Sequence, residues 1–154
     1  MKIGVSACLL GHPVRYDGGH KREPAVVDVL AKWAELIPVC PEVEGGLGTP
    51  REPMAFVKKN GRCRLEGLQS GRDLTDVMVR FAERRCAELD VLGLAGFVFK
   101  ARSPSCGLRN VPGAGRGIFA DAFVRRYPGL PVVEEGDLRE PGSVKAFLKE
   151  TAKR

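Results

Sequence analysis

Residues 2–11, Lys2-Ile-Gly-Val-Ser-Ala-Cys-Leu-Leu-Gly11, decide the fold class. The run is short and apolar and ends at a glycine, which predicts a buried strand followed by a loop. Similar patterns predict further strands over 36–40, 91–100 and 130–134, and helices over 25–35, 73–89, 118–127 and 141–151. Because strands alternate with helices, the sequence predicts a mainly parallel sheet with helices on both faces.

An Asn-Gly step at Asn60-Gly61 lies between two short β-prone runs and predicts a hairpin with strands near 55–58 and 63–66. We therefore expect one compact Rossmann-like α/β domain over residues 1–154, with the hairpin as a small insertion. Two long segments, Glu42–Pro53 and Arg102–Gly117, read as loops. Loops of this length in a compact domain are usually functional or disordered.

The charge pattern does not favour a nucleic-acid partner. Lys and Arg number 25 against 19 Asp and Glu, a net charge of +6, but they are scattered and aromatic residues are only 6%. The longest stretch without these charged residues, Ile3–Val14, is shorter than the roughly 20 residues that a membrane helix needs. We expect a soluble cytoplasmic protein with no membrane segment.

Three of the five cysteines occupy corresponding places in the predicted fold. Cys8 and Cys40 follow the first and second strands, and Cys106 lies in the loop after the third. The carboxyl ends of parallel strands meet at one edge of a sheet, so we expect these thiols to converge. Cys63, in the hairpin, and Cys86, in a helix, are interpreted as small buried apolar residues.

Converging thiols are typical of a soft metal or an iron–sulfur cluster. Zinc usually takes four protein ligands, or three with an open position, and the two histidines, His12 and His20, both lie in the first loop. A four-iron cluster held by three cysteines would leave one iron open for substrate. The chain contains no C-x-x-C pair.

These residues also carry a family resemblance. The chain resembles the thiouracil desulfidase family, small bacterial proteins formerly classed as a domain of unknown function. The matching stretches follow one another over most of the chain: Val5-Ser-Ala-Cys-Leu-Leu-Gly11, Val14-Arg-Tyr-Asp-Gly-Gly19, Val39-Cys-Pro-Glu42, Gly45-Gly-Leu47, Pro50-Arg51, Gly71-Arg-Asp-Leu-Thr75, Ser103-Pro-Ser-Cys-Gly107 and Gly115-Arg-Gly-Ile-Phe119. The sequence departs from the family at Ala55, where such proteins often have Glu.

The resemblance implies a [4Fe-4S] cluster held by Cys8, Cys40 and Cys106, with the fourth iron open. It implies an enzyme that removes sulfur from a thiolated pyrimidine such as thiouracil and gives the oxo base and sulfide. The expected partners are this small substrate and the cluster-assembly machinery, and the expected state is a monomer or homodimer.

A water that attacks the thiocarbonyl carbon needs a base. Glu42, two residues after a ligand, is the first candidate, and Glu44 is its rival. Ser103 is the second catalytic candidate, as a hydroxyl that donates to the substrate or relays a proton. The residues expected to bind substrate or to shape the pocket are Arg15, Asp17, Arg51 and Ser105, with Arg102 as a further source of positive charge.

Two other classes remain open on the sequence. The first is a Rossmann-like module that binds a nucleotide without turnover, although the first loop carries neither G-x-G-x-x-G nor a Walker pattern. The second is a zinc-binding or redox-sensing protein that uses the same three thiols.

Overall fold

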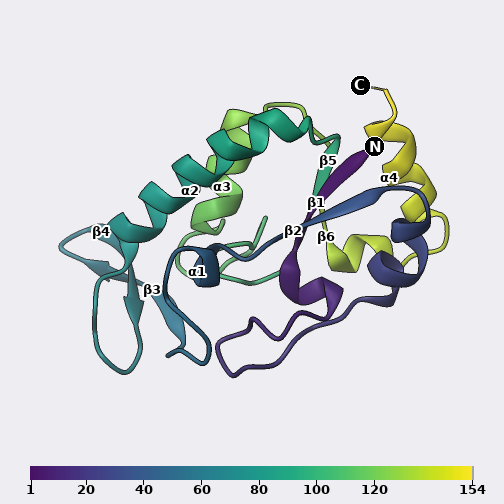
Figure 1. Cartoon of the computed structure of the whole chain (residues 1–154). Helices are drawn as coiled ribbons and strands as arrows, with labels where there is room; N and C mark the ends of the chain where they lie inside the picture. Colours follow the sequence, from purple (N-terminus) through teal and green to yellow (C-terminus); the bar gives the residue numbers. More distant parts are fainter. Residues whose placement is uncertain (154) are drawn as a thin grey trace.

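A parallel sheet forms the centre of the molecule, which a computed structural model describes over residues 1–153 (Figure 1). Its four strands lie in the order β2-β1-β5-β6. Their bounds are β1 (Lys2–Ser6), β2 (Glu35–Val39), β5 (Gly96–Phe99) and β6 (Val132–Glu134). The register pairs Ser6 with Val39, so β1 and β2 end at the same level and the residues that follow them begin side by side.

Helical elements cover both faces of the sheet, as expected. On one face, α2 (Thr75–Leu89) and α3 (Ile118–Arg126) pack against Phe97 and Phe99 of β5. Val98, which points the opposite way, packs with β1 and with residues from the helical elements of the second face. Gly4 of β1 leaves room for Phe97, because a Cβ there would lie 2.3 Å from that ring.

The second face is covered by short elements rather than by long helices. These are η1 (Ala7–Leu10), the π-helical turn η2 (Ala25–Val29), η3 (Leu30–Lys32), η5 (Glu135–Leu138) and α4 (Ser143–Thr151). The remaining helical pieces are α1 (Pro41–Glu44) and η4 (Asp90–Leu92). Leu9, Val26, Leu30, Leu138 and Phe147 bury their side chains under the sheet from this side.

The predicted hairpin is present as β3 (Met54–Lys59) and β4 (Arg62–Gly67), with Asn60 and Gly61 at the turn. It lies at one end of the molecule, beyond α1 and beside the start of α2 (Figure 1). Phe56 and Leu65 are paired across the two strands, and Leu65 packs on Leu74 and Met78. The hairpin therefore joins the rest of the protein through a small apolar cluster of its own.

Several sequence expectations need correction. The predicted helix 25–35 is two short irregular turns, η2 and η3, and not one α-helix. The strand predicted over 91–100 begins only at Gly96, because 90–92 form a 3₁₀ turn. The second strand lies at the edge of the sheet, and only Val39 of its five residues is buried. Cys86 is buried as expected, whereas Cys63 is exposed.

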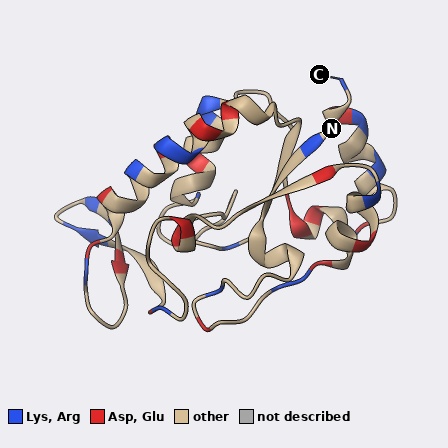
Figure 2. Cartoon of the chain, in the orientation of Figure 1, with Lys and Arg blue, Asp and Glu red and all other residues tan. Residues whose placement is uncertain are grey.

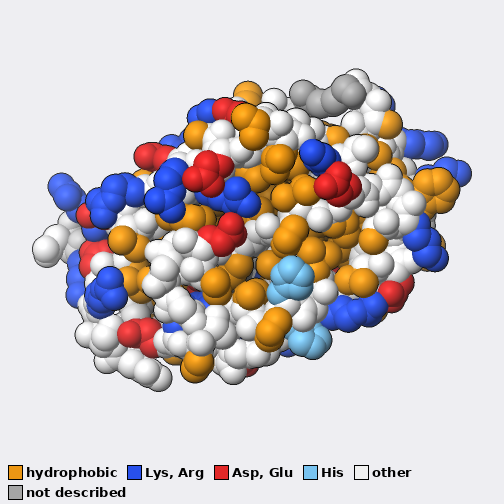
Figure 3. Space-filling view, in the orientation of Figure 1, with side chains coloured by type: hydrophobic (Ala, Val, Ile, Leu, Met, Phe, Trp, Pro, Cys, Tyr) orange, Lys and Arg blue, Asp and Glu red, His pale blue; other side chains and the backbone are white. Residues whose placement is uncertain are grey.

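Charged residues lie mostly on the outer helices, the loops and the β3–β4 hairpin, while the strands of the central sheet carry few of them (Figure 2). On the face shown in Figure 3, basic and acidic side chains are interspersed and do not gather into one basic patch. No helix within residues 1–153 combines the length and the apolar character that crossing a bilayer would require.

Candidate active site

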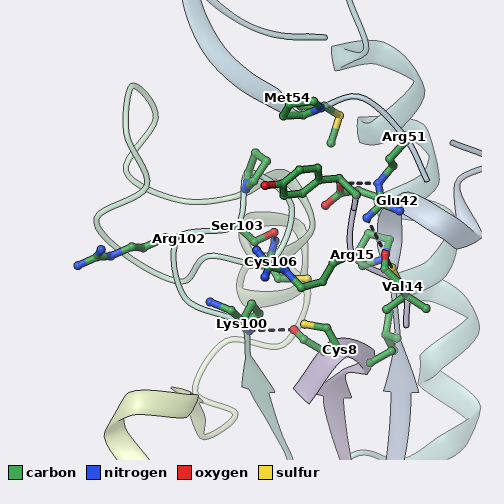
Figure 4. A pocket seen from close by; sticks show the side chains of 18 of the residues that line it. Cys8, Val14, Arg15, Glu42, Arg51, Met54, Lys100, Arg102, Ser103 and Cys106 are labelled. Atoms are coloured by element: carbon green, nitrogen blue, oxygen red, sulfur yellow. Dashed lines mark hydrogen bonds and ion pairs between the residues drawn. The ribbon is translucent and has the colours of Figure 1, made fainter. Parts of the chain in front are cut away.

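The three cysteines at the strand ends line one cavity. Cys8, Cys40 and Cys106 are among the residues that line a space of about 380 Å³ at the carboxyl edge of the sheet. Figure 4 shows Cys8 and Cys106 in this cavity. Cys63 and Cys86 are not among its lining residues. The topology produces this arrangement, since β2, β1 and β5 are consecutive in the sheet and each leads into a segment that carries one of the three thiols.

Each thiol is positioned by local backbone structure. Cys8 lies in η1, a 3₁₀ turn that starts directly after β1 and ends at Gly11 in the left-handed region. Cys40 directly precedes α1, and its backbone amide donates a hydrogen bond to the Glu44 carboxylate at 2.6 Å. Cys106 donates its amide to Ser103 Oγ at 3.0 Å. Short turns rather than long helices therefore present all three.

Burial raises the pKa of all three thiols. The pKa of Cys8 rises to about 11. Burial also raises the pKa of Cys40, although the backbone amides of Val43 and Glu42 oppose it. Burial raises the pKa of Cys106 well above the ordinary value, and a hydrogen bond with the Ser6 side chain opposes this. Charge on Cys8 and Cys40 disfavours charge on Cys106, so the thiols act on one another. Without a cation the protonated forms are favoured.

Glu42 lies in the cavity wall with both carboxylate oxygens held. Arg51 Nε donates to Oε1 at 3.0 Å, and Ser105 Oγ donates to Oε2 at 3.1 Å. The Arg51 side chain is only 7% exposed and also donates to the Val14 carbonyl at 2.8 Å. The carboxylate is therefore fixed at the cavity. Its rival Glu44 is not among the lining residues and instead pairs with Arg85 at 3.1 Å.

The two serines predicted beside Cys106 have different places. Ser103 lines the cavity, and its hydroxyl oxygen accepts hydrogen bonds from the amides of Ser105 and Cys106. Ser105 is fully buried behind Glu42 and does not line the cavity. Ser105 thus supports the Glu42 carboxylate, and its expected role in substrate binding stays a prediction.

Of the remaining predicted residues, Arg15 and Arg51 line the cavity and Asp17 does not. The Asp17 carboxylate accepts the Gly19 amide at 2.9 Å within an exposed loop. Asp17 therefore lies outside the cavity lining and braces its own loop, and its expected contact with substrate stays a prediction. Arg102 borders the cavity, but its side chain extends away from the cysteines (Figure 4).

Two further residues at the site, Ser6 and Lys100, were not predicted from the sequence. Ser6 is 2% exposed and accepts the backbone amide of Lys100 at 2.9 Å, which ties β1 to the end of β5. Lys100 lines the cavity from the end of β5. Met54, at the start of the hairpin, closes the cavity on the side opposite Cys8 (Figure 4). The signal available for Lys100 was its place at a strand end, the criterion that found the cysteines.

The donor set suits a cluster better than a single ion. Within residues 1–153, no three His, Cys, Asp or Glu side chains are grouped as they would be around one metal ion. Sulfurs on one zinc ion lie about 4 Å apart, whereas thiolates on a four-iron cluster are separated by roughly 6–7 Å. Among the described lining residues there is no fourth cysteine and no histidine. Three soft donors around a cavity fit a cluster with one open iron.

Fold and site together define a Rossmann-like α/β protein with a three-thiol pocket at the carboxyl edge of its sheet. The sequence model of a family described as 2-thiouracil desulfurase matches residues 3–135, and the chain belongs to this family. The expected relationship and the expected α/β fold are both confirmed.

Two known proteins are similar to this chain over nearly its whole length. The chain is 29% identical over 149 residues to the "Uncharacterized protein YbbK" of Bacillus subtilis (strain 168), a match that covers 90% of this chain and 98% of the relative. It is 33% identical to a solved structure described as a [4Fe-4S]-dependent thiouracil desulfidase, TudS, with a TM-score of 0.76. That match covers 96% of this chain and 97% of the other.

Proposed function

We propose that this protein cleaves the carbon–sulfur bond of a thiolated pyrimidine of the thiouracil type by hydrolysis, using a [4Fe-4S] cluster held by Cys8, Cys40 and Cys106. The observation that carries the proposal is the convergence of these three thiols with a fixed carboxylate, Glu42, in one cavity. The 33% identical structure with the same fold and this dependence on a cluster supports it.

When bound, such a cluster supplies a Lewis-acidic iron for a thiocarbonyl sulfur and makes the ring carbon more electrophilic. Overall, the thiocarbonyl group and one water molecule give the carbonyl group and hydrogen sulfide, with no net oxidation or reduction. Glu42 accepts a proton from the attacking water, since its carboxylate lies at the cavity wall. Arg51 and Ser105 keep that carboxylate oriented throughout.

Ser103 is the candidate for proton relay or for a hydrogen bond to the ring. Its oxygen already accepts two backbone amides, so its hydroxyl hydrogen is directed elsewhere and the cavity is the space beside it. Arg15 contributes a further polar side chain to the cavity lining. The loop that carries Ser103 and Cys106 thus supplies both a cluster ligand and a polar group, which couples cluster binding to substrate orientation.

Anaerobic loading with iron and sulfide tests the proposal. The protein should develop a broad visible absorbance with stoichiometric iron and sulfide, and should convert thiouracil to uracil with release of sulfide. Cys106→Ala should lose both the cluster and the activity. Cys86→Ala, a matched change of a buried cysteine outside the cavity, should keep both.

The same experiment separates the alternatives. A colourless protein that binds zinc would favour the hypothesis of a metal sensor. A brown protein that converts no thiolated pyrimidine would favour a redox or binding module. Because clusters are assembled and kept reduced inside cells, we also propose a cytoplasmic location and dependence on the cluster-assembly machinery.

A further inference from the structure

A buried ion pair stands at the Cys8 side of the cavity and has no part in the mechanism above. Lys100 Nζ lies 3.1 Å from Glu135 Oε1, and the two side chains are 22% and 7% exposed. Lys100 follows β5, and Glu135 follows β6, the next strand of the sheet. Both residues therefore come from the same sheet edge as the thiols.

The pair is held in one orientation. Glu135 Oε2 accepts the Ala101 amide at 2.7 Å, so both oxygens of the carboxylate are engaged. Lys100 Nζ donates in addition to the Ala101 carbonyl at 2.8 Å. A lysine on a flexible stem usually moves its charge into solvent. Here two hydrogen-bonded partners keep that charge beside the cavity.

Lys100 and Cys8 are neighbours at the cavity. They follow the adjacent strands β5 and β1, both line the cavity, and Figure 4 shows them next to each other at its base. A positive charge on Lys100 therefore acts on the Cys8 side of the cavity.

The other cations at the cavity are differently engaged. Arg51 is bonded to Glu42, and Arg15 lies over the Tyr16 ring, with its guanidinium carbon 5.7 Å from the ring centroid. The Arg102 side chain extends away from the cysteines (Figure 4). Lys100 is thus a cavity cation that an ion pair with Glu135 holds in place beside Cys8 (Figure 4).

We propose that Lys100, positioned by Glu135, stabilises the negative charge that develops on sulfur when it leaves the substrate as hydrosulfide. The inference rests on the proposed function, in which water supplies the oxygen of the new carbonyl. One proton of that water goes to Glu42 and the other to the departing sulfur, which takes the electron pair of the broken bond. Three thiolates and a hydrosulfide share one partly buried space. A fixed cation in such surroundings has a stronger effect than it would have in water.

The test uses the cluster-loaded protein without substrate and measures two quantities, the reduction potential of the cluster and the dissociation constant for hydrosulfide from an absorbance titration. Lys100→Met removes the cation, so the potential should fall and hydrosulfide should bind roughly tenfold more weakly or worse. Glu135→Gln removes the opposing anion but keeps an acceptor for the Ala101 amide. Its potential should rise, and hydrosulfide should bind at least as tightly as to the wild type.

Opposite shifts distinguish a charge effect from simple damage, because a disturbed loop would move both variants in the same direction. Lys100→Arg keeps the cation and should restore most of the wild-type potential and affinity. If Lys100→Met does not fold, the reduction potential and hydrosulfide affinity of Glu135→Gln and Lys100→Arg are compared with those of the wild type. Wild-type potential and affinity in Glu135→Gln, or shifts of the same sign in Glu135→Gln and Lys100→Met, would overturn the role of the pair.

The failure of the proposed function would look different. A wild-type protein that takes up no cluster would overturn both proposals at the loading step. A wild-type protein that binds the cluster and hydrosulfide, with variants that match it in both measurements, would overturn the role of Lys100 alone.

Discussion

Glu42 is the residue on which the proposed hydrolysis depends most directly. Its carboxylate lies in the cavity wall, held by Arg51 and Ser105. Glu42→Gln preserves the shape of the side chain and removes the base, and a lost general base commonly costs about 10²–10⁴ in rate. We expect the variant to load a full cluster and to turn over thiouracil at least about a hundredfold more slowly in a steady-state assay.

Glu44→Gln is the matched control. Its side chain accepts the Cys40 amide and pairs with Arg85 outside the cavity, and glutamine retains an acceptor for that amide. Its rate should stay near that of the wild type. An inactive Glu44→Gln together with an active Glu42→Gln would mean that the base is Glu44 and not Glu42. Two active variants would mean that water is activated without either carboxylate.

Among single residues, the positions of the three cysteines could be predicted from the sequence better than those of the residues that support them. Strand ends are visible in a pattern of apolar runs, so Cys8, Cys40 and Cys106 could be placed at one sheet edge. Ser6 carries no comparable signal, because its contact with Lys100 joins residues far apart in the chain. Ser105 and Asp17 could not be assigned, because the direction of a loop side chain depends on hydrogen bonds that spacing does not reveal.

Among the elements, regular segments were predictable and irregular ones were not. The hairpin follows from Asn60-Gly61, since its turn needs two residues in the left-handed region. The segment after Pro24 has apolar residues at helical spacing, but three β-branched valines disfavour a regular helix, and the chain forms the turns η2 and η3. Tertiary packing of Val26 and Leu30 under the sheet decides its shape.

The ends of α2 and α3 are joined by a charged contact that should depend on pH. Asp90, directly after α2, accepts a hydrogen bond from Arg126 Nε at 2.9 Å and one from the Tyr127 hydroxyl at 2.6 Å. These bonds, that of Arg126 first, lower the pKa of the Asp90 carboxyl from 3.8 to about 2. A lowered pKa in the folded state stabilises the protein above the unfolded-state value, and the effect is lost as pH falls toward 2.

Asp90→Asn removes this dependence. The variant should have a lower free energy of unfolding than the wild type at neutral pH, and the difference should shrink between pH 4 and pH 2 as the wild-type carboxyl is protonated. Urea denaturation of the cluster-free proteins at a series of pH values measures it. Parallel curves for the two proteins over that range would show that the contact does not contribute to the acid sensitivity of the fold.

For the whole molecule, the sheet and the proposed cluster hold different parts of the chain. Two apolar clusters on opposite faces hold the sheet and its helices together, through Phe97 and Phe99 on one side and Ile3 and Val5 on the other. The three thiols instead connect η1, the start of α1 and the loop that contains Cys106. We therefore expect the fold to form without the cluster, unlike that of small domains that unfold when their metal is removed.

Removal of the cluster under anaerobic chelation should therefore leave the far-ultraviolet circular dichroism close to that of the loaded protein. The thermal midpoint should fall by several degrees, because a group that binds only the folded state stabilises it. Limited proteolysis should become faster in the loops over 12–23 and 101–117, which no longer share a common anchor. In Cys86→Ala the thermal midpoint should fall on chelation, as it does in the wild type. In Cys106→Ala the midpoint should already be low before chelation and should not fall further when the chelator is added. Loss of the helical signal on chelation would mean that the cluster, and not the two apolar faces of the sheet, specifies the fold.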